Sequence, residues 1–133
     1  MELVVDTNVV MAAIIRSGNT RRLLFHHDLA CFSPRYLLKE LAKYEAMLRI
    51  KSGLSSAEFQ EAVRRVLSRI HLIHPDEYSR YRDYASSICP DFGDWPFFAV
   101  AIQKNCPLWT NDPALLRQNR LPTYATAALV DLL

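Results

Sequence analysis

Apolar and polar residues along the chain fall into blocks that predict short strands and helices in alternation. Runs rich in β-branched and aromatic residues predict strands, which are residues 3–5, 30–32, 70–73, 108–110 and 122–124. Apolar residues at helical spacing predict helices between them and after the last strand. Strands that alternate with helices indicate an α/β fold with three layers, α/β/α, around a short central parallel sheet of four to five strands.

Helix boundary signals refine this outline. Ser33 and Pro34 match an N-cap and a first-turn proline, and the long helix that they predict ends near Gly53. Ser55 and Glu58 form a capping-box pattern, which predicts the start of the next helix. One helix is expected from Pro75 to Ile88, and a break follows it at 89–93. The apolar run 95–102 then predicts a helix buried against the sheet.

Composition limits the classes that remain. A length of 133 residues, of which 50% are hydrophobic and 23% are charged, suits one globular domain spanning 1–133 and excludes a disordered chain. A net charge of +2 does not by itself indicate nucleic-acid binding. The three cysteines lack the spacing of a disulfide framework or a zinc knuckle. With no signal peptide and no apolar span of membrane length, we expect a cytoplasmic protein that does not contact a membrane.

Two acidic residues are expected where an α/β fold places its ligands, beyond the carboxyl ends of the strands, and three more could converge with them. Asp6 directly follows the first strand, and Asp112 comes two residues after the fourth. Asp91 and Asp94 flank the break before the buried helix, and Glu40 lies in the helix after the second strand. Carboxylates gathered in one pocket repel unless a cation compensates them, and oxygen ligands favour Mg²⁺ or Mn²⁺. The pattern therefore predicts a divalent-metal site suited to phosphodiester hydrolysis.

A simpler interpretation exists for each acid alone. Asp6, Asp94 and Asp112 each precede a helix, so each could be an N-cap that accepts backbone N–H bonds. Asp91 could be an ordinary loop acid, and Glu40 a solvated helix residue. Only the joint pattern favours metal binding.

That joint pattern resembles the ordered motifs of PIN domains, and the resemblance covers nearly the whole chain. It rests on four segments in order: Asp6-Thr7-Asn8 after an apolar strand, Glu40 after Ser33-Pro34, Asp91-Phe92-Gly93-Asp94 followed by residues 96–101, and Thr110-Asn111-Asp112 after Leu108-Trp109. Each segment is weak alone, because a strand followed by an aspartate is common. Four in order on matching elements are much more specific.

The resemblance implies a ribonuclease in which Asp6, Glu40, Asp94 and Asp112 bind Mg²⁺ or Mn²⁺ and position water, with Asp91 as an auxiliary ligand. Four polar neighbours would fix the carboxylate rotamers: Thr7, Asn8, Thr110 and Asn111. Many PIN domains are VapC-type toxins, so the resemblance also implies an RNA substrate, a homodimer and a cognate antitoxin.

Other side chains offer weaker candidate sites. Basic residues on the helices could contact RNA phosphates, and those nearest Asp6 and Glu40 are Arg21, Arg22 and Lys43. The more common role of such residues is a solvated helix face. Neither His26-His27 nor the pair His71 and His74 specifies a tetrahedral zinc site. Packing is the expected role of the remaining aromatic residues in these helices, which are Tyr78, Tyr81, Tyr84, Trp95, Phe97 and Phe98.

Three alternative functions compete with the ribonuclease. Enzymes of the haloacid-dehalogenase type need a second acid two residues after the first, where this chain has Asn8. A receiver-like domain would carry its aspartate after the third strand, where the chain has His74-Pro75. The remaining rival is a PIN-like scaffold that binds RNA or protein, with carboxylates that cap helices and no productive metal.

Overall fold

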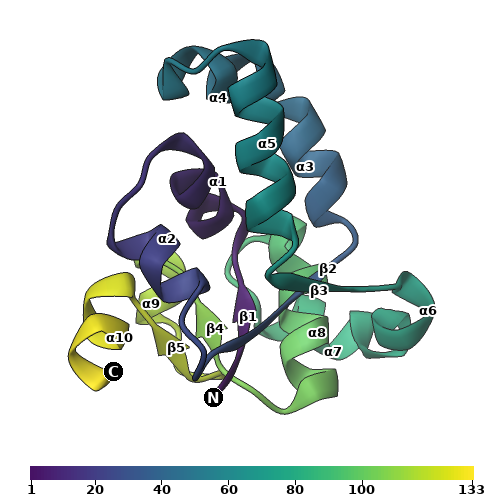
Figure 1. The fold of residues 1–133 in the computed structure, drawn as a ribbon. Helices are drawn as coiled ribbons and strands as arrows, with labels where there is room; N and C mark the ends of the chain where they lie inside the picture. Colours follow the sequence, from purple (N-terminus) through teal and green to yellow (C-terminus); the bar gives the residue numbers. More distant parts are fainter.

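The computed structural model describes all 133 residues and contains one five-stranded sheet. Every strand pairing is parallel, and the strand order is β3-β2-β1-β4-β5. The strands are β1 (Glu2–Val5), β2 (Ala30–Pro34), β3 (Ile70–Ile73), β4 (Leu108–Trp109) and β5 (Thr123–Tyr124). The predicted α/β/α architecture with a short parallel sheet is confirmed (Figure 1).

Helices cover both faces of the sheet. The first face carries α1 (Thr7–Ile15), α2 (Asn19–Leu24), α4 (Glu45–Ser52), α5 (Ser56–Leu67) and α10 (Thr126–Leu132), joined at one edge by α3 (Leu37–Lys43). The second face carries α6 (Pro75–Tyr78), α7 (Arg82–Ile88), α8 (Trp95–Lys104) and α9 (Pro113–Arg117). In Figure 1, α3, α4 and α5 rise above the end of the sheet where β1 leads into α1.

The central strand separates two apolar cores. Leu3 and Val5 of β1 pack with α1 and its neighbours, whereas Val4 packs with α8 on the other side. Successive side chains of a strand point to opposite faces, so a fully apolar β1 is what a sheet covered on both faces requires. The same alternation leaves Asp6 at the end of β1, where the strand emerges from between the layers.

Ser33 and Pro34 belong to β2, so their prediction as a helix start is wrong. Pro34 is tolerated in a parallel sheet because the pairing of β2 with β1 ends at Phe32, and only the pairing with β3 continues to Pro34. The Ser33 hydroxyl is buried and donates to the backbone oxygen of Val5 at 3.2 Å. Ser33 therefore stabilises the sheet instead of capping a helix.

Two predicted helices are also divided. The helix expected up to Gly53 breaks at Tyr44, whose φ of −102° and ψ of 9° end α3 and start α4. The bend lets Leu48 of α4 reach the core beside α1. The helix expected from Pro75 to Ile88 consists of α6, a 3₁₀ turn η1 (Ser79–Tyr81) and α7. The capping box of Ser55 and Glu58 is confirmed at the start of α5.

Strand order gathers segments that are distant in sequence. The chain leaves β1 toward β2 on one side and returns to β4 on the other, so a switch point lies between β1 and β4. Loops that leave adjacent strands in opposite directions open a crevice at such a point. Asp6 follows β1 and Asp112 follows β4, so both border this crevice. No helix combines the length and apolarity needed to cross a membrane.

Candidate metal-binding active site

Asp6 is the most buried of the five acids, with 7% of its surface exposed. The Thr110 hydroxyl, at the end of β4, donates to Asp6 Oδ2 at 2.8 Å. Burial raises the pKa of Asp6, and the nearby carboxylates of Asp112 and Glu40 raise it further, whereas the hydrogen bond from Thr110 and the nearby backbone N–H of Thr7 lower it. Asp6 is thus a buried carboxylate held in place by the adjacent strand.

Glu40 lies in the first turn of α3 and faces the start of α1. The hydroxyl of Thr7 donates to Glu40 Oε1 at 2.6 Å, a link between residues 33 positions apart. Thr7 is itself buried, so its rotamer is restricted by packing. A side chain with three rotatable bonds is in this way fixed beside Asp6.

Asp94 stands just before α8, and Asp91 lies three residues earlier, in front of the short 3₁₀ turn η2 (Phe92–Asp94). Burial raises the pKa of Asp94 to about 7, and the carboxylates of Asp6, Asp91, Asp112 and Glu40 add to the shift. Asp94 therefore lies close enough to each of the other four acids to be repelled by its charge. The structure brings together the residues that sequence placed on four separate segments.

Hydrogen bonds separate the acids that cap helices from those that do not. Asp112 Oδ1 accepts from Ala114 N at 2.8 Å, and Asp91 Oδ1 accepts from Gly93 N at 3.0 Å, so both act as caps. Asp6 and Asp94 occupy N-cap positions but make no side-chain capping bond. Capping therefore does not explain the two acids with raised pKa, and these two carry the case for another role.

The donor set fits a hard divalent cation. None of the five carboxylates forms a salt bridge with Lys, Arg or His, so no side chain compensates their charge. The site supplies only oxygen ligands of the kind that Mg²⁺ and Mn²⁺ prefer. No three of these acids have oxygens all within 4.8 Å of one another. That spacing leaves direct bonds to one or two carboxylates, with the other acids reached through the waters that Mg²⁺ keeps.

The two predicted asparagines differ from the two threonines. Asn111 Nδ2 donates to Thr126 Oγ1 at 2.9 Å, and Asn111 Oδ1 accepts from Thr126 N at the same distance. Asn111 thus ties the β4 loop to the start of α10. Asn8 is exposed and its side chain has no hydrogen bond to a carboxylate. Direct contacts to carboxylates come from Thr7 and Thr110 alone among these four residues.

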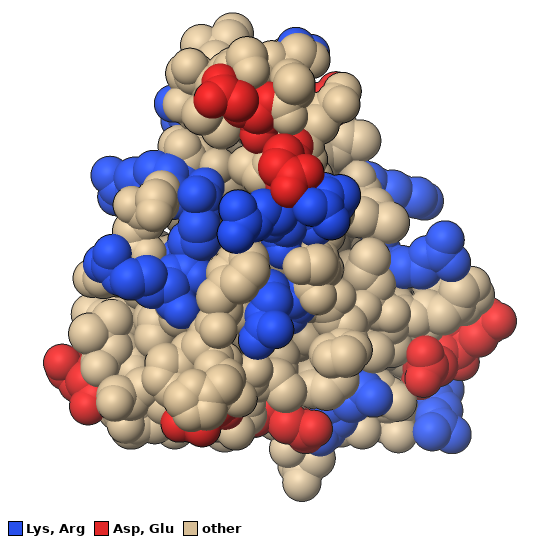
Figure 2. All heavy atoms as spheres, viewed as in Figure 1, with Lys and Arg blue, Asp and Glu red and all other residues tan.

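Basic side chains gather over α2 and α5, where Figure 2 shows a band of Lys and Arg across this face. Arg21 donates to the backbone oxygens of Ala13 and Ile14 at 2.7 and 3.1 Å, which satisfies the C-terminal carbonyls of α1. Arg22 is exposed and bonds to the Asn19 side chain. Lys43 is exposed and lies 5.3 Å from the ring centre of Tyr44. Arg21 has a structural role that the sequence did not indicate.

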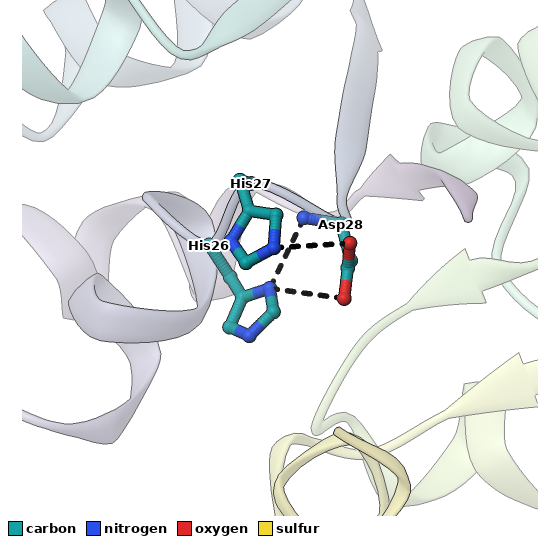
Figure 3. Close-up of side chains that lie close together, drawn as sticks. All are labelled: His26, His27 and Asp28. Atoms are coloured by element: carbon teal, nitrogen blue, oxygen red, sulfur yellow. Dashed lines mark hydrogen bonds and ion pairs between the residues drawn. The ribbon is translucent and has the colours of Figure 1, made fainter.

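His26, His27 and Asp28 form a separate polar cluster in the turn between α2 and β2 (Figure 3). The two rings stack at 4.8 Å, and His27 Nε2 lies 3.3 Å from Asp28 Oδ1. Asp28 N donates to His26 Nδ1, so that nitrogen is already engaged. This is the only group of three side chains whose metal-ligating atoms all lie within 4.8 Å. It precedes β2, at the edge of the sheet opposite the carboxylates.

The other histidines and the aromatic residues have varied environments. His71 packs against Phe32, and His74 Nδ1 accepts from Asp76 N, so these two do not share a site. Tyr78 is buried against Trp95, but Tyr84 is 52% exposed, so its expected packing role is wrong. Trp95 is only half-buried, unlike the buried Phe97 and Phe98 that follow it.

The sequence did not predict a groove that lies beside the carboxylates. It lies between the start of α3, the start of α6 and the loop before α8, and Arg82, Phe92 and Trp95 line it. Phe92 counted only as part of a loop in the sequence, although it stands between two candidate ligands, Asp91 and Asp94. An aromatic residue placed between two acids was the signal available in the sequence.

Comparisons with known proteins give a consistent assignment. No curated protein matches the chain. Among solved structures, a chain from the crystal structure of VapBC2 from Rickettsia felis, bound to a DNA fragment from their promoter, is similar in fold. The TM-score is 0.61 and the identity 19%, with 94% of this chain and 98% of that chain covered. A family model described as a PIN domain matches residues 4–126, which include all five acids. The chain therefore belongs to the PIN-domain family.

Proposed function

We propose that this protein is a metal-dependent ribonuclease that hydrolyses RNA phosphodiester bonds. The observation that carries the proposal is the convergence of five carboxylates at the switch point of the sheet with no cationic side chain to compensate them. Such a pocket is electrostatically costly in a protein without a ligand and becomes favourable when a divalent cation binds. Family membership supports a nuclease.

Each acid has a defined part in this proposal. Asp6, Glu40, Asp94 and Asp112 hold Mg²⁺ or Mn²⁺, and Asp91 is an auxiliary ligand. When bound, the metal supplies the Lewis acid that phosphodiester hydrolysis needs. The protein's own contribution is rigidity, because Thr110 holds Asp6 and Thr7 holds Glu40 in fixed rotamers.

A toxin role in a toxin–antitoxin pair is the biological setting that we propose. Similarity in fold to a chain of a VapBC2 complex supports it. A groove of about 740 Å³ between α2 and α5 offers a surface for an antitoxin, since Phe25 and Leu54 are exposed there beside Arg22 and Arg65. We also propose a homodimer, because Val130, Leu132 and Leu133 leave apolar surface exposed on and just after α10. Light scattering of the purified protein tests the dimer.

The test of the nuclease proposal is a cleavage assay on single-stranded and structured RNA, in Mn²⁺, in Mg²⁺ and in EDTA. We expect cleavage by the wild type that EDTA abolishes, and at least a hundredfold loss of rate in Asp6→Asn. Asp28→Asn is the matched control, because Asp28 is exposed before β2, at the edge of the sheet opposite the carboxylates. Cleavage by Asp6→Asn at the wild-type rate would refute the assignment.

The rival function is a PIN-like module that binds RNA or protein without cutting. It predicts that the wild type binds RNA yet leaves it intact with either metal. Asn keeps the size of Asp and removes its charge, so thermal melting of Asp6→Asn shows whether a lost activity reflects misfolding. If Asp6→Asn melts at the wild-type temperature but does not cleave RNA, the lost activity is due to the site and not to misfolding.

A further inference from the structure

The groove beside the carboxylates has a volume of about 670 Å³ and lies within one or two residues of two proposed ligands. Lys39 of its lining directly precedes Glu40, and Gly93 directly precedes Asp94. A polymer whose phosphate sits at the carboxylates therefore extends its neighbouring units along this groove. That position makes the chemistry of the lining informative about the substrate.

Aromatic surface is exposed in the lining of the groove. Phe92 is 61% exposed and lies between Asp91 and Asp94 in the chain. Trp95 is half-buried beside it, with its ring 5.8 Å from that of Tyr78. Flat apolar rings open to solvent next to a phosphate-processing site are typical of platforms on which nucleic-acid bases stack.

A guanidinium group connects the two rings. Arg82 lies 5.1 Å from the ring centre of Trp95 and 6.0 Å from that of Phe92. It forms no salt bridge, so its charge is available to a ligand. An arginine held over aromatic faces presents a planar cation that suits phosphate oxygens and the faces of bases.

The charge of the lining has one sign. Arg35, Lys39 and Arg82 line the groove, and no Asp or Glu does. The larger groove between α2 and α5 differs, since Glu58 and Glu61 line it together with arginines. An anionic chain is therefore attracted to the groove beside the carboxylates, and its negative charge is complemented along its path.

We propose that this groove is a nucleotide subsite, in which an unpaired base next to the cleaved phosphate stacks on Phe92 and its phosphate contacts Arg82. The inference rests on the proposed ribonuclease function and adds where the substrate lies. A base can reach Phe92 only if it is free of its partner, because a paired base is stacked within its helix. The groove thus selects single-stranded segments of RNA.

The experiment measures binding of a fluorescein-labelled, mixed-sequence single-stranded 12-mer RNA by anisotropy at low salt. Ca²⁺, a divalent cation that carboxylates also bind, replaces Mg²⁺ so that their charge is compensated, and a gel checks that the RNA stays intact. We expect Phe92→Ala to weaken binding about tenfold, the scale of one lost stacking contact. Phe92→Trp should restore it. Tyr84→Ala removes an exposed aromatic ring of α7 that does not line the groove and should bind as the wild type does.

Charge is controlled by a second pair of variants. Arg82→Ala and Arg80→Ala lower the net charge equally, but Arg80 lies over Tyr81 and does not line the groove. We expect a loss of about tenfold for Arg82→Ala and less than twofold for Arg80→Ala. RNA of the same sequence annealed to its complement should bind the wild type at least tenfold more weakly than the single strand.

The outcomes separate this inference from the nuclease proposal. Wild-type binding by Phe92→Ala, or equal losses in Phe92→Ala and Tyr84→Ala, would overturn the subsite while cleavage by the wild type still stood. If Phe92→Ala binds RNA more weakly than the wild type does, but the wild type cleaves no RNA, the subsite is supported and the nuclease proposal is refuted. No measurable binding of RNA by the wild type, together with direct binding of a labelled acidic peptide, would assign the groove to a protein partner and overturn the inference.

Discussion

The Thr110 hydroxyl donates to Asp6 Oδ2 at 2.8 Å, although the two residues are 104 positions apart. Thr110 Oγ1 also accepts a hydrogen bond from Asp112 N at 3.0 Å, so one threonine orders two of the acids. Thr110 is fully buried, and its strand lies beside β1 in the sheet. A single hydroxyl thus couples the geometry of the site to the pairing of β1 and β4.

Thr110→Val tests this coupling, because valine keeps the shape and removes the hydroxyl. We expect Mn²⁺ affinity, measured by calorimetry, to fall about tenfold, as is typical when a group that orients a metal ligand is lost. The pKa of Asp6 should rise further, since the lost hydrogen bond lowers it. Thr110→Ser should restore most of the affinity, and an equal loss in the serine variant would show that the methyl group matters instead.

Asp94 predicts how metal binding depends on pH. Its pKa of about 7 lies above its ordinary value, so protons compete with metal for this carboxylate up to neutral pH. We expect Mn²⁺ affinity to increase between pH 6 and 8 and the increase to be smaller in Asp94→Asn. Identical pH profiles for the two proteins would contradict the assignment.

The same shift predicts the effect of metal on stability. A carboxylate whose pKa is raised in the folded state contributes stability below its unfolded pKa, and this contribution is lost as the pH rises through about 7. The metal-free protein should therefore lose this contribution between about pH 4 and pH 7. Bound Mn²⁺ offsets the repulsion, so its effect on the melting temperature should be larger at pH 8 than at pH 5.5. Differential scanning fluorimetry measures both.

Asp112 and Asp6 should respond differently to removal of the side chain. Asp112→Ala removes the cap of α9 and is expected to cost about 1 kcal/mol of unfolding free energy, whereas Asp112→Asn keeps the cap. Asp6 makes no capping bond and is buried among other acids, so Asp6→Asn should leave the protein as stable or make it more stable. Urea denaturation measures these differences. A large destabilisation by Asp6→Asn would indicate a structural role.

The neighbouring residues Arg21 and Arg22 should differ in how much they contribute to the stability of the fold. Arg21→Ala leaves the backbone oxygens of Ala13 and Ile14 without their charged donor, so we expect a loss of about 2 kcal/mol in unfolding free energy. Arg22→Ala removes an exposed side chain and should change stability by less than about 0.5 kcal/mol. Equal stability of the two variants would show that Arg21 does not stabilise the end of α1.

Local sequence predicted the elements that depend on local signals. The β-branched run of β1 and the capping box of Ser55 and Glu58 act over a few residues, so both were predicted correctly. Ser33-Pro34 carries an equally good helix-start signal, yet it lies in β2. Pairing with β3 and the bond from Ser33 to Val5 outweigh that signal, and both come from residues distant in the chain.

The candidate site likewise has features that the sequence determines and features that only the tertiary structure decides. Sequence by itself determined which acids follow the strands, because parallel strands present their carboxyl ends at one edge. Tertiary structure alone decided that Thr7 and Thr110 contact carboxylates whereas Asn111 bonds to Thr126, and that Phe92 opens into a basic groove. Strand order sets these contacts, since β4 lies beside β1 although more than a hundred residues separate their ends. A spacing along the chain specifies which residues are available, and only the packed sheet specifies which of them meet.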